Sequence, residues 1–179
     1  VNMIGCNQLP IAVCNSVTIN ANALGTASIT YVDIDGGSSD PDGDAMTFTV
    51  SNSGPFSLGA HSVTLTVTDP SNATSSCIAM VTVVDVLPPS AVAQNVTIQL
   101  NAAGSATTTA SAVNNGSSDP GGIANMSLDV SSFTCANVGA NAVKLTVIDN
   151  YGNVSFDTAT VTVEDNVYPI AIAQNVTVQ

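Results

Sequence analysis

Positive charge is almost absent from this sequence. Of its 179 residues, one is Lys or Arg (Lys144) and 13 are Asp or Glu, so the formal net charge is −12. A protein that binds nucleic acid needs cationic side chains to displace the counterions condensed on the phosphates. The sequence therefore predicts no nucleic-acid partner, and the same deficit argues against anionic membranes and phosphorylated substrates.

Aromatic residues and long apolar runs are scarce as well. Tryptophan is absent and aromatic residues make up 4% of the chain. The longest apolar runs fall far short of the roughly 20 residues that cross a bilayer, so we expect no membrane insertion. No positively charged segment precedes an apolar one, so no signal peptide is visible. Hydrophobic residues still amount to 45% of the chain, which is ample for a packed core.

The residues that are abundant favour strands. The chain has 24 Val and 20 Thr, and a branched Cβ loses rotamer freedom in a helix but packs well on a pleated surface. Apolar and polar residues alternate with a period of two, as in Val63, Leu65 and Val67, and again in Val143 and Leu145. No segment has the apolar stripe of a helix, so the pattern predicts an all-β protein.

The chain repeats itself. Residues 10–19 match residues 89–98 and again 169–178, at offsets of 79 and 80 residues. The sequence therefore predicts the end of a preceding repeat or a linker at 1–9, one repeat at 10–88, a second at 89–168, and the first strand of a third at 169–179. We interpret the chain as a fragment of a longer repeat array.

Each repeat has the pattern of a small immunoglobulin-like β-sandwich. About seven short strands are separated by Gly, Pro, Asn and Asp turn signals every 8–12 residues. The linkers are short and contain proline, which fixes φ and keeps the residue before it extended. We therefore expect tandem sandwiches joined into a semi-rigid rod.

Four cysteines indicate the redox setting. Cys14 lies on the first strand of repeat 1 and Cys77 near its last, and both are replaced in repeat 2, by Ala93 and Asp157. Because the two disappear together, we predict a Cys14–Cys77 disulfide and an extracellular location. Cys6 and Cys135 are either free or buried thiols, or pair across a repeat or between chains.

Acidic turns supply the candidate metal ligands. Five carboxylates crowd into twelve residues of repeat 1, where Ca²⁺ would find the oxygen ligands it prefers; with one from a strand end, the candidates are Asp33, Asp35, Asp40, Asp42, Asp44 and Asp69. The alternative is a solvated acidic turn. Repeat 2 keeps only Asp119 of the five, which argues against a site there. A weaker candidate is the linker set Glu164, Asp165 and Asn166, whose alternative is a plain polar linker.

Catalysis has little support. His61 is the only histidine and precedes a strand, so a Ser-His-Asp triad would require a chance arrangement. With no Trp and 3 Tyr, the sugar platforms that usually accompany a glycosidase carboxylate pair are lacking. We therefore predict that the protein is not an enzyme and name no catalytic residue.

Several motifs resemble those of a known family. Residues 93–100, 115–119, 132–140, 145–149 and 161–166 are similar to the HYR-like, immunoglobulin-like repeats of giant surface adhesins in Bacteroidota, which include gliding-motility adhesins and other type IX secretion substrates. The first repeat, with residues 40–44, also resembles bacterial cadherin- and PKD-like repeats, which often bind calcium.

The resemblance has three implications for individual residues. It supports the Cys14–Cys77 disulfide, which is similar to one carried by HYR modules. It implies a partner for Cys135 in a turn where this chain has Gly121 instead, which leaves Cys135 unpaired. It also makes Thr158 a possible O-glycosylation site, because Asp157-Thr158-Ala159 fits a three-residue motif of this phylum; the alternative is a plain strand threonine.

We predict a structural function. The repeats act as extracellular spacers in a surface adhesin or filament, and a disulfide and Ca²⁺ stiffen them. The expected partners are other repeats of the same chain and copies associating laterally or end to end. Two alternatives remain open. A repeat could bind a carbohydrate or protein ligand through its loops, or segment 170–179 could complete a neighbouring subunit by donor-strand exchange.

Overall fold

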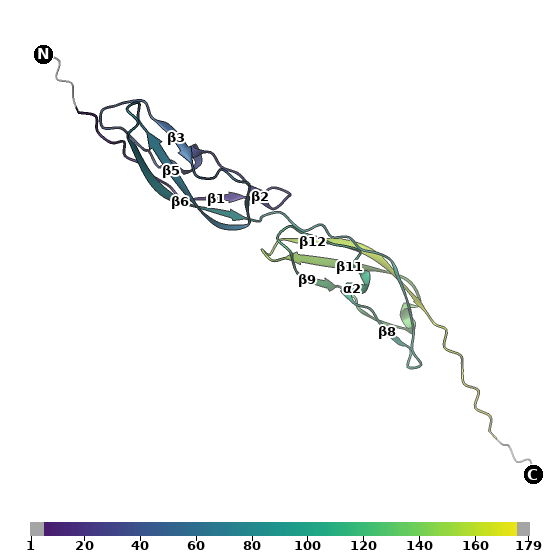
Figure 1. The fold of residues 1–179 in the computed structure, drawn as a ribbon. Helices are drawn as coiled ribbons and strands as arrows, with labels where there is room; N and C mark the ends of the chain where they lie inside the picture. Colours follow the sequence, from purple (N-terminus) through teal and green to yellow (C-terminus); the bar gives the residue numbers. More distant parts are fainter. Residues whose placement is uncertain (1–5, 175–179) are drawn as a thin grey trace, which may run out of the picture. The chain divides into compact units, whose positions relative to one another are not determined.

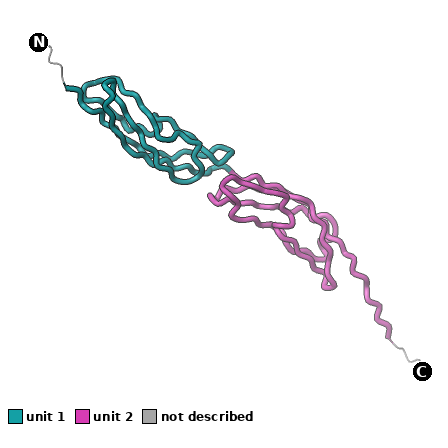
Figure 2. Tube along the Cα trace, in the orientation of Figure 1, with its two compact units in different colours: residues 1–87 teal, residues 88–179 magenta. Residues whose placement is uncertain are grey.

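The computed structural model describes residues 6–174 and divides the chain into two compact units, residues 1–87 and 88–179 (Figure 2). We call them unit 1 and unit 2. The division falls after Leu87, whereas the repeat pattern predicted it after residue 88. The last five residues of the predicted third-repeat strand, 175–179, lie outside the described residues, as do residues 1–5.

Unit 1 is a β-sandwich (Figure 1). Its larger sheet has the strand order β1-β6-β5-β3, in which β1 runs parallel to β6 and the other neighbours are antiparallel. A second, two-stranded sheet pairs β2 with β4. The strands are β1 (Val17–Asn20), β2 (Thr26–Ala27), β3 (Thr47–Val50), β4 (Phe56–Ser57), β5 (Gly59–Thr68) and β6 (Thr74–Val84).

Unit 2 repeats this topology. Its larger sheet has the order β7-β12-β11-β9, with β7 parallel to β12, and its smaller sheet pairs β10 with β8. The strands are β7 (Val96–Gln99), β8 (Ser105–Thr107), β9 (Ile123–Leu128), β10 (Ser132–Thr134), β11 (Gly139–Asp149) and β12 (Val154–Glu164). The all-β prediction is confirmed.

The period of two in the sequence explains the two separate cores. Val63, Leu65 and Val67 of β5 are 0% exposed, and the threonines between them lie on the other face of the sheet. Phe56 of β4 packs against them from the smaller sheet. Unit 2 has the same arrangement around Leu145 and Phe133. Each unit therefore closes its own hydrophobic core.

Short helical turns depart from the sequence-based expectation. The structure has α1 (Tyr31–Ile34), α2 (Ala110–Val113) and the 3₁₀ turn η1 (Cys135–Asn137). In α1, the carboxylate of Asp33 accepts a hydrogen bond of 2.6 Å from the Thr30 backbone N–H. The last helical residue of each α turn, Ile34 or Val113, is fully buried. One turn is too short to produce a periodic stripe, so the pattern could not reveal it.

The structure contains the predicted Cys14–Cys77 disulfide, with a Cα–Cα distance of 5.8 Å. It ties the first segment of unit 1 to the middle of β6. At the same place in unit 2, the Asp157 carboxylate accepts a 2.8 Å hydrogen bond from the Ala93 backbone N–H. Among the residues that the structure describes, no helix is long and apolar enough to span a bilayer.

Candidate metal-binding carboxylate cluster

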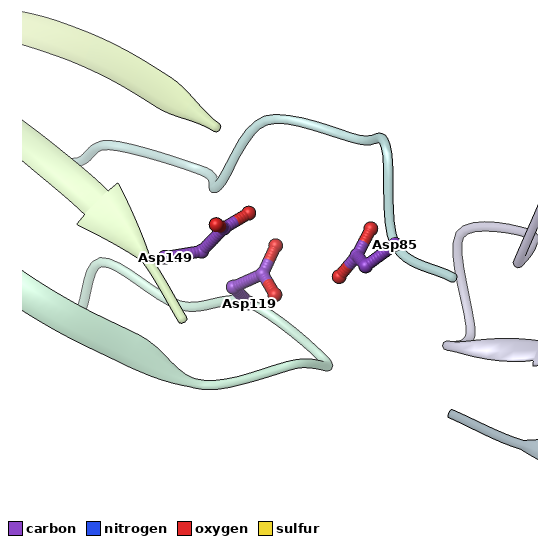
Figure 3. Close-up of side chains that lie close together, drawn as sticks. All are labelled: Asp85, Asp119 and Asp149. Atoms are coloured by element: carbon purple, nitrogen blue, oxygen red, sulfur yellow. The ribbon is translucent and has the colours of Figure 1, made fainter. Parts of the chain in front are cut away.

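Three aspartates have carboxylate oxygen atoms that lie close to one another. Asp119 lies in the turn after α2, Asp149 is the last residue of β11, and Asp85 belongs to the connecting segment that follows β6. Their oxygen atoms lie within 4.8 Å of one another (Figure 3). Within residues 6–174, these three residues form the one group of at least three Asp, Glu, His or Cys side chains that lie close enough to share a metal ion.

Asp149 is the most constrained member, at 1% exposed. One carboxylate oxygen accepts hydrogen bonds from the backbone N–H groups of Tyr151 and Asn153, at 2.8 and 2.9 Å, and the other accepts from the Asn153 amide at 2.8 Å. Burial by itself would raise the pKa of Asp149, but these hydrogen bonds outweigh it and hold the pKa below the ordinary 3.8. The side chain is therefore an anion at neutral pH.

The other two members are also held by backbone donors. Asp119 accepts a 2.7 Å hydrogen bond from the Gly121 N–H. Asp85 is 7% exposed and accepts a 3.0 Å hydrogen bond from the Leu87 N–H. Each of these bonds spans two residues, which is the geometry of an Asx turn, and each fixes where its carboxylate points. The local sequence thus orients all three groups.

The chemistry of the cluster fits a hard divalent cation. Three like charges at this distance repel one another, and burial weakens the screening by water. All of the donor atoms are carboxylate oxygens, with neither thiol nor imidazole among them. Ca²⁺ takes six to eight oxygen ligands from carboxylates, backbone carbonyls and water. Asp85, Asp119 and Asp149 are the residues that would hold it.

Two of the predicted calcium ligands of unit 1, Asp33 and Asp35, are engaged in local turns. Asp33 caps α1, and Asp35 accepts hydrogen bonds of 2.9 and 2.6 Å from the backbone N–H and hydroxyl of Ser38. For Asp35, burial would raise the pKa, but the Ser38 hydrogen bonds bring it below 3.8. Both side chains thus stabilise local turns, and neither belongs to a close group of three carboxylates in the described part of the chain.

Two other candidates of unit 1, Asp42 and Asp69, accept hydrogen bonds from side-chain amides. Asp42 accepts from both the backbone N–H and the side-chain amide of Gln8, at 2.7 and 3.1 Å. Asp69 accepts a 2.8 Å hydrogen bond from the Asn7 amide, the main cause of its lowered pKa. Asp40 accepts from the backbone N–H groups of Asp42 and Asp44, while its second oxygen is buried without a hydrogen-bond partner.

The repeat register shows why the equivalent positions of the first repeat lack a third carboxylate. Asp40 and Asp69 are equivalent to Asp119 and Asp149, but the position of Asp85 is taken in unit 1 by Cys6. The number of carboxylates crowded into residues 33–44 favoured a site in the first repeat. The signal that could have found the cluster was the spacing between a linker Asp, a turn Asp and a strand-end Asp.

The weaker linker set is engaged in side-chain hydrogen bonds. The Gln99 amide donates to Glu164 and its carbonyl accepts from Asn166, both at 2.5 Å. Asp165 accepts a 3.1 Å hydrogen bond from the Val167 N–H. These contacts fix the start of the segment after β12 without placing the two carboxylates in a close group of three.

Two further residues singled out in the sequence are surface features. The His61 ring nitrogen Nε2 lies 2.8 Å from the Ser57 backbone carbonyl, and its ring centroid is 5.1 Å from that of Phe56. Both contacts hold the ring against its own hairpin. Thr158 is exposed on β12, opposite Lys144 in the antiparallel register.

Comparisons with known proteins identify the fold. No family model matches the chain, and no curated protein matches its sequence. The structure is similar to the EC1-2 fragment of human protocadherin-24, with a TM-score of 0.50 and 15% identity over 89% of this chain and 100% of that one. It is also similar to EC1-4 of Drosophila N-cadherin, with a TM-score of 0.50 and 13% identity over 88% of this chain and 50% of that one. The chain therefore has the fold of tandem cadherin-like, immunoglobulin-like domains.

Proposed function

We propose that this chain consists of structural spacer repeats from an extracellular, adhesion-type protein. The observation that supports it best is the repetition of a complete unit: both repeats have the same strand order and each has its own buried core. Each further repeat of this kind lengthens the chain by one unit that buries its own core. The connecting segment contains Pro88 and Pro89, which restrict the backbone between the repeats.

The disulfide supports the extracellular part of the proposal. Disulfides persist in oxidising compartments, and Cys14–Cys77 closes a loop of 63 residues in unit 1. The finer assignment, to HYR-like repeats of Bacteroidota surface adhesins exported by type IX secretion, rests on the sequence motifs. The proposal includes no catalytic role, because the contacts of His61 are to a backbone carbonyl and a phenyl ring.

Calcium is the second part of the proposal. Bound to Asp85, Asp119 and Asp149, the cation would neutralise three repelling charges and restrict the connecting segment that carries Asp85. Its stabilising effect would grow with the logarithm of its concentration above the dissociation constant.

Thermal unfolding of the whole chain in Ca²⁺ and in a chelator tests the calcium site. We expect Ca²⁺ to raise the Tm of the parent chain and not that of Asp149→Asn, whose amide oxygen can still accept the backbone hydrogen bonds. The matched control is Asp69→Asn at the equivalent position of unit 1, which should keep the calcium response. Equal Tm values of the parent chain with and without Ca²⁺ would exclude the site.

Small-angle scattering tests the spacer role separately. We expect the maximum dimension of the chain to be close to the summed lengths of two sandwich units, with a narrower distribution of dimensions in Ca²⁺ than in chelator. A compact particle in both conditions would contradict the spacer role. Specific retention of one glycan on an array would instead favour the carbohydrate-binding alternative.

A further inference from the structure

An asparagine or aspartate directly precedes a glycine at residues 35–36, 42–43 and 115–116. In such a pair the glycine nitrogen can attack the side-chain carbonyl carbon of the residue before it, because no Cβ blocks the approach. The product is a five-membered succinimide ring. Asparagine is among the chemically labile residues, and its neutral amide is a better target than an ionised carboxylate. The sequence therefore offers two aspartate sites and one asparagine site, Asn115, for the same reaction.

The structure distinguishes the three attacking nitrogens. The Gly36 N–H donates to the Val13 carbonyl at 2.8 Å, and the Gly43 N–H donates to the Asp40 carbonyl at 3.1 Å. Within the described residues, the peptide group that joins residues 115–116 makes no hydrogen bond through its N–H or its carbonyl. A hydrogen bond must be broken before a peptide group can turn toward a side chain, which costs free energy. Attack is therefore opposed at the first two sites and unopposed at the third.

The side chains that would be attacked differ in the same way. Asp35 accepts hydrogen bonds from Ser38, and Asp42 accepts them from Gln8, so both carboxylates are held in place. Asn115 is exposed, and no hydrogen bond to its amide is present in the part of the chain that the structure describes. Its side chain is therefore able to rotate toward the next nitrogen of the chain.

The turn around Gly116 also leaves room for the ring to close. Gly116 has a φ of 85°, which glycine adopts without steric cost, and beyond its chain neighbours no heavy atom lies within 4 Å of the place that a Cβ would occupy. The ends of the turn are fixed. The Asn115 N–H donates to the Val92 carbonyl at 2.9 Å, and Ser118 exchanges backbone hydrogen bonds of 2.9 and 3.0 Å with Ser90. The reacting peptide group thus lies between two fixed points.

We propose that Asn115 is a site of spontaneous modification to isoaspartate and aspartate, controlled by the structure, and that the two aspartate–glycine pairs are protected from the same ring closure. The Gly116 nitrogen forms a bond to the Asn115 Cγ, the bond between Cγ and the amide nitrogen breaks, and ammonia leaves with the proton of the Gly116 N–H. Water then opens the ring. Opening at the backbone carbonyl gives isoaspartate, and opening at the Cγ carbonyl gives aspartate, so no oxidant or cofactor is required.

Isoaspartate would lengthen the turn that leads to Asp119. The main chain then passes through the Cβ and Cγ of residue 115, which adds a methylene group between the two fixed points. We expect this to weaken the pairing of Ser118 with Ser90 and to speed hydrogen exchange from their amides. The proposal goes beyond the spacer role, because the second repeat would change chemically with age. The first repeat has Gly36 at the equivalent position and has no amide to lose there.

Incubation of the whole chain at mildly alkaline pH, followed by peptide mapping, tests the proposal. We expect ammonia release and isoaspartate at residue 115, identified by mass spectrometry and by labelling with an isoaspartyl methyltransferase, while residues 35–36 and 42–43 stay unchanged. Asn115→Gly, which installs the residue found in unit 1, should abolish both signals. The proposal fails if Asn115 stays intact while a synthetic peptide of residues 112–119 reacts under the same conditions, or if isoaspartate forms as fast at residues 35 or 42.

A second variant tests whether the structure, rather than the residue pair, controls the reaction. Ala102→Gly creates another asparagine–glycine pair in unit 2, but there the Asn101 amide oxygen accepts hydrogen bonds of 2.9 and 3.1 Å from the N–H groups of Ala103 and Ser105. In the folded chain residue 101 should react at least several-fold more slowly than residue 115, and in urea the two rates should converge. Equal rates in the folded chain would contradict control by the structure.

Discussion

The two units solve the same structural problem by different chemistry. In unit 1 a disulfide joins the first segment to β6, while in unit 2 the equivalent positions are joined by the hydrogen bond from the Ala93 N–H to Asp157. The strand order and the register around the two positions are the same. The comparison shows that the same fold accommodates either a covalent or a hydrogen-bonded attachment at this point.

The acidic ends of the units differ in a similar way. In unit 1 the side-chain amides of Asn7 and Gln8 donate to Asp69 and Asp42. In unit 2 Asp149 and Asp119 lie close to a third carboxylate, that of Asp85. Three linker positions differ between the two ends: Cys6, Asn7 and Gln8 stand where the next linker has Asp85, Val86 and Leu87. The first set supplies amide donors and the second supplies a third carboxylate.

The largest expected difference between the units comes from removing the disulfide of unit 1. Cys14→Ala with Cys77→Ala should destabilise unit 1 by about 4 kcal/mol, because a 63-residue loop is no longer closed in the unfolded state. Hydrogen exchange of the β5 and β11 amides reports on each unit separately. Exchange from β11 should not change, and faster exchange there would contradict the independence of the two cores.

The reciprocal variant sharpens the same comparison. Ala93→Cys with Asp157→Cys should form a disulfide in unit 2 and slow hydrogen exchange from β11, because the two positions already lie within hydrogen-bonding distance. A measurement of free thiols shows whether the bond has formed. If it forms without slowing exchange, the Asp157 hydrogen bond is as effective as the covalent link.

A smaller difference is expected at two equivalent glycines. Gly43 and Gly122 both have positive φ, at 79° and 86°, so alanine should cost about 1–2 kcal/mol at either position. A Cβ at Gly122 would also come within 2.7 Å of the Asn150 amide nitrogen, whereas Gly43 has open space. Urea unfolding should therefore show a larger loss for Gly122→Ala, and Asn150→Ala should remove the excess.

The smallest effect is the acid sensitivity of the Asp157 attachment. Hydrogen bonds from the Ala93 and Thr158 N–H groups lower the pKa of Asp157 below 3.8. Since the folded state has the lower pKa, the contribution to stability is complete above about pH 3.8 and is lost as the pH falls through the folded pKa. Over that pH interval, unit 2 of the Asp157→Asn variant should lose less stability than unit 2 of the parent chain. Hydrogen exchange of the β11 amides measures both losses. Equal losses would show that other carboxylates control the acid sensitivity of unit 2.

Much of the fold could be read from local pattern. The alternation through Val63, Leu65 and Val67 predicted a strand with one buried face, and the offsets of the repeated segments predicted two units. The paired loss of Cys14 and Cys77 in the second repeat predicted their disulfide. The helical turns at Tyr31–Ile34 and Ala110–Val113 were missed, because one turn leaves no periodicity to detect.

The candidate site was harder to predict, because it depends on distances between residues far apart in the chain. Asp85, Asp119 and Asp149 are separated by about thirty residues each, and the acidic run of unit 1 looked richer in ligands. In that run Asp35 accepts hydrogen bonds from Ser38 and Asp42 from Gln8, and no three of its carboxylates lie close together within the described residues. The spacing between a linker Asp, a turn Asp and a strand-end Asp is the sequence feature that corresponds to the close group of three.

By itself, the sequence of this protein determined the strands, the repeat and the absence of cationic surface, since each depends on residue type and short-range period. Only the tertiary structure decided which carboxylates lie close together. It also decided that a hydrogen bond from the Ala93 N–H to Asp157 replaces the disulfide in unit 2. It left the peptide group between Asn115 and Gly116 without a hydrogen bond to any described residue. The physical reason is that strand pairing brings together side chains whose separation along the chain carries no local signal.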